Sequence, residues 1–130
     1  MSYLLGIRDA SQFYSHPLVG NIFENMVVVE AVKHRLNQGL EPDCWFYRNS
    51  SGSIEVDLLF EDGGKLLFED GGKLHPREIK SSSTFSSDMR EHLETFSRLA
   101  SNVARSLVVY SGETHTDVAV NFADVSDWCR

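Results

Sequence analysis

Three charged residues near the middle of the chain have the types and spacing of a divalent-metal site. Asp57 lies late in a predicted strand, and Glu78 and Lys80 end the next one. Side chains alternate along a strand, so Glu78 and Lys80 share a face, which Asp57 joins if the two strands pair as neighbours. Carboxylates are preferred Mg²⁺ ligands. Lys80 beside the ion would position or activate the attacking water and offset charge developing on a phosphoryl group. The pattern therefore predicts a magnesium site suited to phosphodiester hydrolysis.

Two further residues are candidates for the same site. Glu24 lies in an apolar helix and, as a half-buried carboxylate, would hold a second ion or one of its waters. The backbone carbonyl of Ile79 would join Asp57 and Glu78 as a metal ligand. An alternative is that the strand residues are ordinary charges at a solvent-facing edge, since Glu-x-Lys triplets are common. Glu24 would then be a carboxylate at the helix rim, because glutamate is almost never fully buried unless paired.

Residues 17–38 are predicted to form the helix that carries Glu24. Pro17 suits a first turn, and Gly39 suits the position just past the end. One apolar stripe is predicted to face the core: Val19, Ile22, Met26, Val29, Val32 and Leu36. Glu24 falls on another side of the helix, where its neighbours Val27, Val28 and Ala31 are apolar as well.

The remaining elements predict an α/β fold. Strands are predicted over residues 44–48, 54–60, 74–80 and 106–110, with a weaker strand over 117–122. A helix is predicted to begin at Asp88, with Glu91 as its capping-box partner. The first three strands should be antiparallel, and the crossover through this helix should place the fourth parallel to the third. The expected fold is one domain over residues 1–130, a short mixed sheet in the order α-β-β-β-α-β flanked by helices.

A direct repeat lies inside the predicted hairpin. Residues 58–65 (LLFEDGGK) are followed at once by an identical octamer over 66–73. A turn at the Asp-Gly-Gly of either copy would separate Asp57 from Glu78, whereas keeping these two opposite each other places the bend near Leu67 and Phe68, which are poor turn residues. The shift of eight residues is even, so pairing alone does not forbid slippage. We expect the duplication to distort the hairpin or to favour strand exchange between two chains.

Composition limits the class of protein. The chain has 130 residues, of which 42% are hydrophobic, and no apolar run reaches the roughly 18 residues that span a bilayer. Cys44 and Cys129 form no CxxC motif, which favours a reduced, cytoplasmic setting. A net charge of −7 argues against tight, independent binding of nucleic acid, because phosphates are neutralised by an excess of Lys and Arg. Strong affinity for nucleic acid would require another domain or subunit.

Several segments together resemble a known family. They are residues 16–25 (HPLVGNIFEN), 45–48 (WFYR), 52–57 (GSIEVD) and 77–82 (REIKSS). This pattern resembles the C-terminal domain of unknown function attached to prokaryotic AAA+ ATPases, which belongs with the restriction-endonuclease-like, PD-(D/E)XK fold. The resemblance covers roughly residues 3 to 128, with the doubled octamer as its one departure.

The resemblance implies a nuclease-like core. Glu24 would correspond to the core-helix glutamate, Asp57 to the motif aspartate, and Glu78 and Lys80 to the E-x-K pair. The chain would be the C-terminal part of a longer ATPase, with a Mg²⁺-dependent nuclease-like site. Two other functions stay open from the sequence: a non-catalytic interaction or oligomerisation domain that keeps the fold, and a degenerate fragment that forms a homodimer by swapping hairpin strands.

Overall fold

The computed structural model of the protein describes residues 4–62 and 72–129. Its elements are α1 (Ala10–Ser15), α2 (Val19–Asn37), β1 (Cys44–Arg48), β2 (Glu55–Asp62), β3 (Lys73–Lys80), the 3₁₀ helix η1 (Ser87–Arg90), α3 (Glu91–Leu99), β4 (Leu107–Tyr110), β5 (Ala119–Asn121) and α4 (Val125–Trp128). The predicted helices and strands are all found close to their expected bounds. Helix α1, whose first turn is capped by the Asp9 carboxylate, was not predicted.

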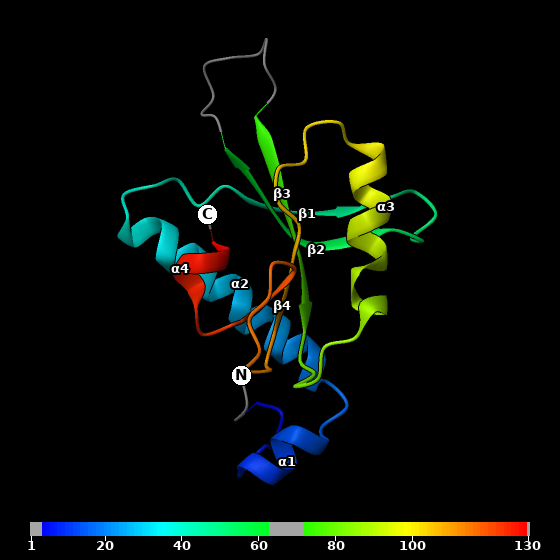
Figure 1. Cartoon of the computed structure of the whole chain (residues 1–130). Helices are drawn as coiled ribbons and strands as arrows, with labels where there is room; N and C mark the ends of the chain where they lie inside the picture. The colour runs from blue at the N-terminus through cyan, green and yellow to red at the C-terminus, as the bar shows by residue number, and fades with distance from the viewer. Residues whose placement is uncertain (1–3, 63–71, 130) are drawn as a thin grey trace.

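The strands form one mixed sheet in the order β1-β2-β3-β4-β5. Strands β1, β2 and β3 are antiparallel neighbours, whereas β3, β4 and β5 are parallel, as the predicted crossover requires. Figure 1 shows α2 and α4 on one side of the sheet and α3 on the other. The predicted α/β class is therefore confirmed. Within the described residues, none of the helices combines the length and apolar character needed to cross a membrane.

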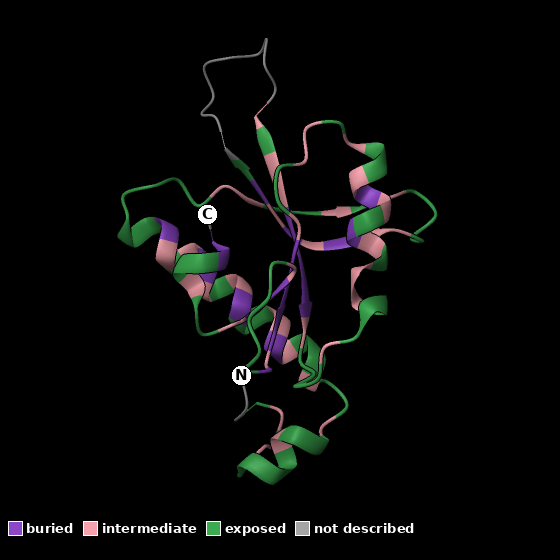
Figure 2. Cartoon of the chain, in the orientation of Figure 1, coloured by how far each residue is buried: buried purple, intermediate pink, exposed green. Residues whose placement is uncertain are grey.

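Two apolar clusters hold the layers together, one on each face of the sheet (Figure 2). The α2 side buries Phe23, Val27, Ala31, Leu58, Phe60, Ile79, Leu107, Val109, Val120, Trp128 and Cys129. The α3 side buries Val56, Leu93, Phe96, Val108, Tyr110 and Ala119. Helix α3 contributes Leu93 and Phe96 to the second cluster, and the half-buried Cys44 packs against the α2-side cluster.

Helix α2 packs on the sheet through a different face from the one predicted. Its buried residues are Phe23, Val27, Ala31 and Arg35, which recur every four positions. None of the predicted stripe is fully buried: Met26, Val29 and Leu36 are exposed, and Val19, Ile22 and Val32 are half-buried. Both faces of this helix are apolar, so periodicity alone did not choose between them. The rotation moves Glu24 to the margin of the sheet-facing surface, beside the buried Phe23.

The hairpin adopts neither of the registers that a turn at an Asp-Gly-Gly sequence would give. Strands β2 and β3 pair from Leu58 opposite Arg77 to Asp62 opposite Lys73. Continued by one residue, this register would place Asp57 opposite Glu78. The bend that joins the strands, including the doubtful turn residues near Leu67, lies outside the described residues. In the described part of the hairpin, the register that keeps the predicted site together is the one formed.

The predicted capping box at the start of the second helix is not formed. The segment begins with η1, whose N-cap is Ser86, and the Met89 N–H donates to the Ser86 carbonyl. Asp88 therefore lies inside the first turn, where its carboxylate accepts from the Ser86 hydroxyl, instead of capping the helix. The extra turn starts the helical segment one residue early and leads directly into Glu91 of α3.

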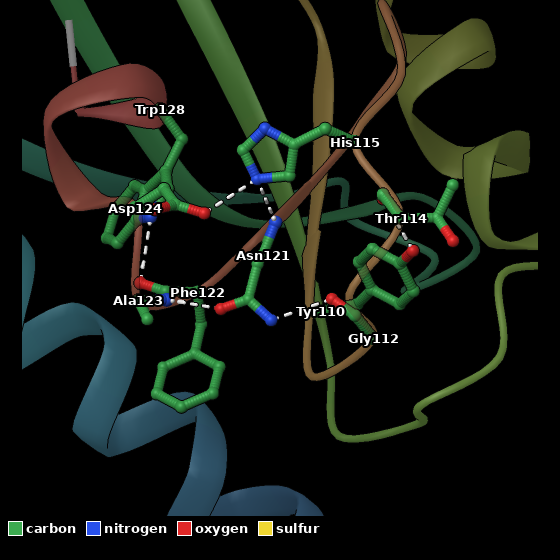
Figure 3. Close-up of polar contacts among 9 residues, drawn as sticks. All are labelled: Tyr110, Gly112, Thr114, His115, Asn121, Phe122, Ala123, Asp124 and Trp128. Atoms are coloured by element: carbon green, nitrogen blue, oxygen red, sulfur yellow. Dashed lines mark hydrogen bonds and ion pairs between the residues drawn. The ribbon is translucent and has the colours of Figure 1, made fainter.

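Hydrogen bonds fasten the chain beyond β5 to the end of β4 (Figure 3). The Asn121 amide donates to the Gly112 carbonyl at 2.7 Å, and its oxygen accepts from the Ala123 N–H at 2.8 Å. The Nε2 atom of His115 lies 3.2 Å from the Asn121 backbone nitrogen and 2.7 Å from Asp124 Oδ2. A neutral ring accepts the first bond and a protonated ring donates the second, so this nitrogen has a partner in either state.

Candidate functional site

The candidate site lies where β2 begins and β3 ends. Asp57 is the third residue of β2, and Glu78 and Lys80 lie in the last three positions of β3. Strands β3 and β4 run parallel, so the site borders the carboxyl ends of parallel strands, where open α/β sheets bind their ligands. Beyond the last paired residues of the hairpin, the Ile79 N–H donates to Asp57 Oδ2 at 2.7 Å. This bond fixes the Asp57 side chain against the β3 backbone.

Glu78 is a buried carboxylate, and within residues 4–62 and 72–129 only one of its oxygens has a hydrogen-bond partner. Its side chain is 4% exposed, and Oε1 lies 2.6 Å from the Nζ atom of Lys80. Its other oxygen, Oε2, is buried and has no hydrogen-bond partner among the described residues. Buried polar atoms almost always have a partner in folded proteins, and an unsatisfied charged oxygen is costly. Such an atom is the expected mark of a site that takes a ligand.

Burial and mutual repulsion make both strand carboxylates weaker acids. Burial, followed by the charge of Asp57, raises the pKa of Glu78, although Lys80 acts in the opposite direction. Burial also raises the pKa of Asp57, against the lowering effect of the Ile79 N–H and of Lys80. Each group therefore lies in an environment that penalises its negative charge. A nearby cation would relieve this penalty.

Lys80 experiences the opposite balance. Burial tends to lower its pKa, but the hydrogen bond and charge of Glu78, with the charges of Asp57 and Glu24, outweigh burial and raise the pKa overall. Lys80 therefore keeps its proton at neutral pH. In this arrangement it is a fixed positive charge that supports Glu78.

Glu24 reaches the site from helix α2. Burial, followed by the charges of Asp57 and Glu55, raises its pKa, which places Glu24 within electrostatic range of the strand acids. Glu24, Glu55 and Asp57 line one cavity of about 280 Å³ on the α2 side. Glu24 and Asp57 therefore share one cavity, and the charges of both act on Lys80.

Glu78 and Lys80 line a cavity on the other side of the hairpin from the cavity that Asp57 lines. Their cavity, of about 230 Å³, lies beneath η1 and the start of α3. In the part of the chain that the structure describes, no three His, Cys, Asp or Glu side chains are grouped so as to hold a metal ion. A metal held by Asp57 and Glu78 would therefore rely on these two side chains and on backbone or water oxygens, the usual habit of Mg²⁺.

Comparison with known proteins identifies the family. Residues 19–126 match the model of a family described as a domain of unknown function, DUF4143. The chain belongs to the DUF4143 family. No curated protein and no solved structure matches the chain. The prediction of a domain of unknown function is confirmed, and the position of this DUF4143 domain beside an ATPase and within the PD-(D/E)XK superfamily stays a prediction.

Sequence reasoning missed two contributors to the site of this DUF4143 domain. His92 lines the same cavity as Glu78, and its charge acts on both Glu78 and Asp57. It directly precedes the buried Leu93, and this place in the first turn of the helix after the Glu-x-Lys strand is the signal that could have found it. Glu55 lines the α2-side cavity with Glu24 and Asp57, two residues before Asp57 on the same strand.

Proposed function

We propose that this DUF4143 domain is a Mg²⁺-dependent phosphodiester hydrolase, a nuclease-like accessory domain of an AAA+ ATPase. The observation that carries the proposal is the buried, unpartnered Oε2 of Glu78, with Lys80 on the other oxygen and Asp57 within electrostatic range. A carboxylate of purely structural value would have both oxygens satisfied or hydrated. The resemblance to the nuclease-like domains of prokaryotic ATPases supports the same assignment.

The residues present suit a hard divalent cation. Asp57 Oδ2 and Glu78 Oε1 are already engaged by the Ile79 N–H and Lys80, so Asp57 Oδ1 and Glu78 Oε2 are the oxygens that would hold the ion, together with the Ile79 carbonyl. When bound, such an ion activates water and neutralises charge on a phosphoryl group. Glu24 would hold a second ion or orient a water.

Lys80 has a narrower role in this proposal than that of a base. Its raised pKa keeps the ammonium group charged, so it attracts a phosphate oxygen and holds Glu78 in position. A neutral lysine would be needed to accept a proton from water. Water activation is therefore assigned to the ion and to the carboxylates.

The charge of the chain sets its relation to nucleic acid. With a net charge of −7, the domain would bind nucleic acid weakly by itself, and a basic surface on the ATPase domain would supply most of the affinity. The acidic site would bind its metal ion first and its substrate second.

Metal binding tests the proposal directly. We expect titration calorimetry to detect Mg²⁺ or Mn²⁺ binding that is lost in Asp57→Asn and in Glu78→Gln, while the exposed Glu61→Gln on β2 serves as the matched control. Metal-dependent cleavage of DNA or RNA should disappear in the same two variants. Metal binding that is equal in all four proteins would overturn the proposal.

A second candidate function is a non-catalytic interaction or oligomerisation domain. It is favoured by the outward face of α2, where Met26, Val29 and Leu36 are exposed on one helix. The related idea of strand swapping depends on the hairpin bend, which lies outside the described residues. Light scattering across a concentration series distinguishes the two ways in which the chain could form a dimer. A dimer that disappears when residues 66–73 are deleted favours swapping, and one that disappears in Val29→Lys favours the helix face.

A further inference from the structure

Two large aromatic side chains border the cavity that contains Asp57. Trp45 is 59% exposed and Phe46 is 75% exposed, although both are residues that normally bury most of their surface. They lie on β1, the edge strand of the sheet, and both line the 280 Å³ cavity together with Asp57 and Glu24. The second tryptophan, Trp128, is fully buried. Exposed aromatic surface is thus gathered beside the proposed catalytic acids.

An irregularity in the strand brings these neighbours to one cavity. Consecutive side chains of a regular strand point to opposite faces. The register between β1 and β2 shifts between Trp45, which pairs with Leu59, and Tyr47, which pairs with Val56. Phe46 therefore lies opposite two residues of β2, Asp57 and Leu58, so the bulge is on β2 and contains Asp57. Bulges occur next to functional sites, and beside this one Trp45 and Phe46, which a regular strand would direct to opposite faces, line the same cavity.

The size and lining of the cavity restrict its occupant. At about 280 Å³ it falls below the range of pockets that hold drug-sized ligands, and it suits one flat ring system. Its described lining includes three carboxylates and no lysine or arginine, so it would not hold a phosphate without a cation. A nucleotide has both a flat ring that stacks on aromatic side chains and a phosphate that a metal ion beside Asp57 could hold.

We propose that Trp45 and Phe46 form a stacking platform for one unpaired base, so that the substrate is single-stranded nucleic acid or a strand with an unpaired base next to the bond that is cut. This inference rests on the proposed function, because the metal beside Asp57 positions the phosphate. A base inside a duplex is stacked and paired, and it could enter the cavity only by leaving the helix.

The same geometry predicts how binding depends on salt. Stacking tolerates any base and requires no phosphate neutralisation, whereas affinity that depends on Lys and Arg falls steeply as salt rises. Because the cavity is acidic, binding by the isolated domain should require a divalent cation and should vary little with added KCl.

The test measures binding of labelled oligonucleotides by fluorescence anisotropy in Ca²⁺. Single-stranded DNA, single-stranded RNA and a blunt duplex of the same sequence are compared on the intact chain. Trp45→Ala and Phe46→Ala should each weaken single-strand binding roughly tenfold or more, the size of one stacked base. Trp45→Phe should keep most of the affinity, and Tyr14→Ala, which removes an aromatic residue that is 76% exposed on α1, should have no effect.

A second readout comes from the intrinsic fluorescence. The chain has two tryptophans, and Trp128 is fully buried, so quenching by a bound strand reports on Trp45. Duplex binding equal to single-strand binding, no binding by any strand, or unchanged affinity in both alanine variants would overturn the inference. A change in self-association alone would assign the aromatic pair to a second copy of the chain, and would overturn it too.

Failure of this inference is separable from failure of the proposed function. Mg²⁺ binding that is lost in Asp57→Asn but unchanged in Trp45→Ala, with cleavage indifferent to Trp45, leaves the hydrolase standing and removes the stacking platform. Strand binding that depends on Trp45 in a protein that neither binds Mg²⁺ through Asp57 nor cuts nucleic acid leaves the platform and removes the hydrolase.

Discussion

Two polar side chains, Asn121 and Glu78, lie near the carboxyl ends of the parallel strands, and they differ in how their polar atoms are hydrogen-bonded. Around Asn121, at the end of β5, the side-chain amide both donates and accepts, and the bonds tie neighbouring loops together. Around Glu78, near the end of the parallel strand β3, a buried carboxylate oxygen has no partner in the described part of the chain. The first arrangement is what stability favours, because buried polar groups are satisfied locally. The second costs stability, and the metal ion that we propose would offset this cost.

Substitution of Gly112, whose carbonyl accepts from Asn121, should cause the largest loss of stability. A Cβ atom there would lie 2.2 Å from the ring of Tyr110 and 2.4 Å from the Ser83 carbonyl oxygen. Gly112→Ala should therefore lower the free energy of unfolding by about 2–4 kcal/mol, measured by urea denaturation.

The matched control for that change is Gly20→Ala. Gly20 lies in α2, with no atom within 4 Å of a Cβ, so alanine should raise stability by about 0.5–1 kcal/mol through helix propensity. Equal effects at Gly112 and Gly20 would show that the end of β4 is loosely packed, and the contrast between the two polar regions would weaken.

Asn121→Ala should give the next largest loss. It leaves the Gly112 carbonyl and the Ala123 N–H without their side-chain partner, which we expect to cost about 1–3 kcal/mol in thermal or urea unfolding. Asn25→Ala, on the exposed side of α2, should stay within about 0.5 kcal/mol of the wild type. An unchanged unfolding free energy in Asn121→Ala would mean that water replaces the hydrogen bonds of the amide. The hydrogen bonds of Asn121 would then contribute no more to stability than the unpartnered oxygen of Glu78.

Glu78→Gln should raise stability, whereas the changes at Gly112 and Asn121 should lower it. Replacing the buried charge by a neutral amide removes much of the desolvation cost, and Lys80, whose side chain is 40% exposed, can be hydrated instead. We expect a gain of about 1 kcal/mol in unfolding free energy at neutral pH. Glu61→Gln on the exposed part of β2 should change little. A clear loss in Glu78→Gln would assign the carboxylate to structure.

The same carboxylate predicts how stability depends on pH. Burial, followed by the charge of Asp57, raises the pKa of Glu78 above its ordinary value of 4.5 in the folded state. Just above pH 4.5 the folded chain therefore holds a proton that the unfolded chain has lost, so stability from this group falls as pH rises, until Glu78 ionises in the folded chain too. Unfolding measured across this range should show that fall, and Mg²⁺ or the Gln variant should flatten it.

The sequence could predict which residues meet but not how their side chains are turned. Strand and helix periodicity placed Asp57, Glu78 and Lys80 at one end of the hairpin, because alternation and antiparallel pairing are local rules. The buried face of α2 could not be chosen, since Phe23 and Met26 lie on faces of similar apolar character and only their fit to the sheet decides between them.

Two features of the site depend on contacts that no local pattern encodes. The bulge opposite Phe46 arises from how β1 meets β2, and the hairpin register is ambiguous in the sequence because the octamer shift is even. The unpartnered oxygen of Glu78 likewise follows from the packing of α3 and η1 over the sheet, and its identification required the structure.

The smallest expected effect concerns the ion pair at the rim of the α2-side cavity. Arg48 lies 2.6 Å from Glu55, but the two side chains are 59% and 38% exposed. Exposed pairs contribute little because water and salt screen them, so Arg48→Ala should cost about 0.2–1 kcal/mol, and less at high salt. A larger, salt-independent loss in urea unfolding would mean that this pair holds the β2 bulge opposite Phe46 in place. The charges at the rim of the cavity would then stabilise the fold, as the hydrogen bonds of Asn121 do. They would differ from Glu78, whose buried charge we expect to cost stability.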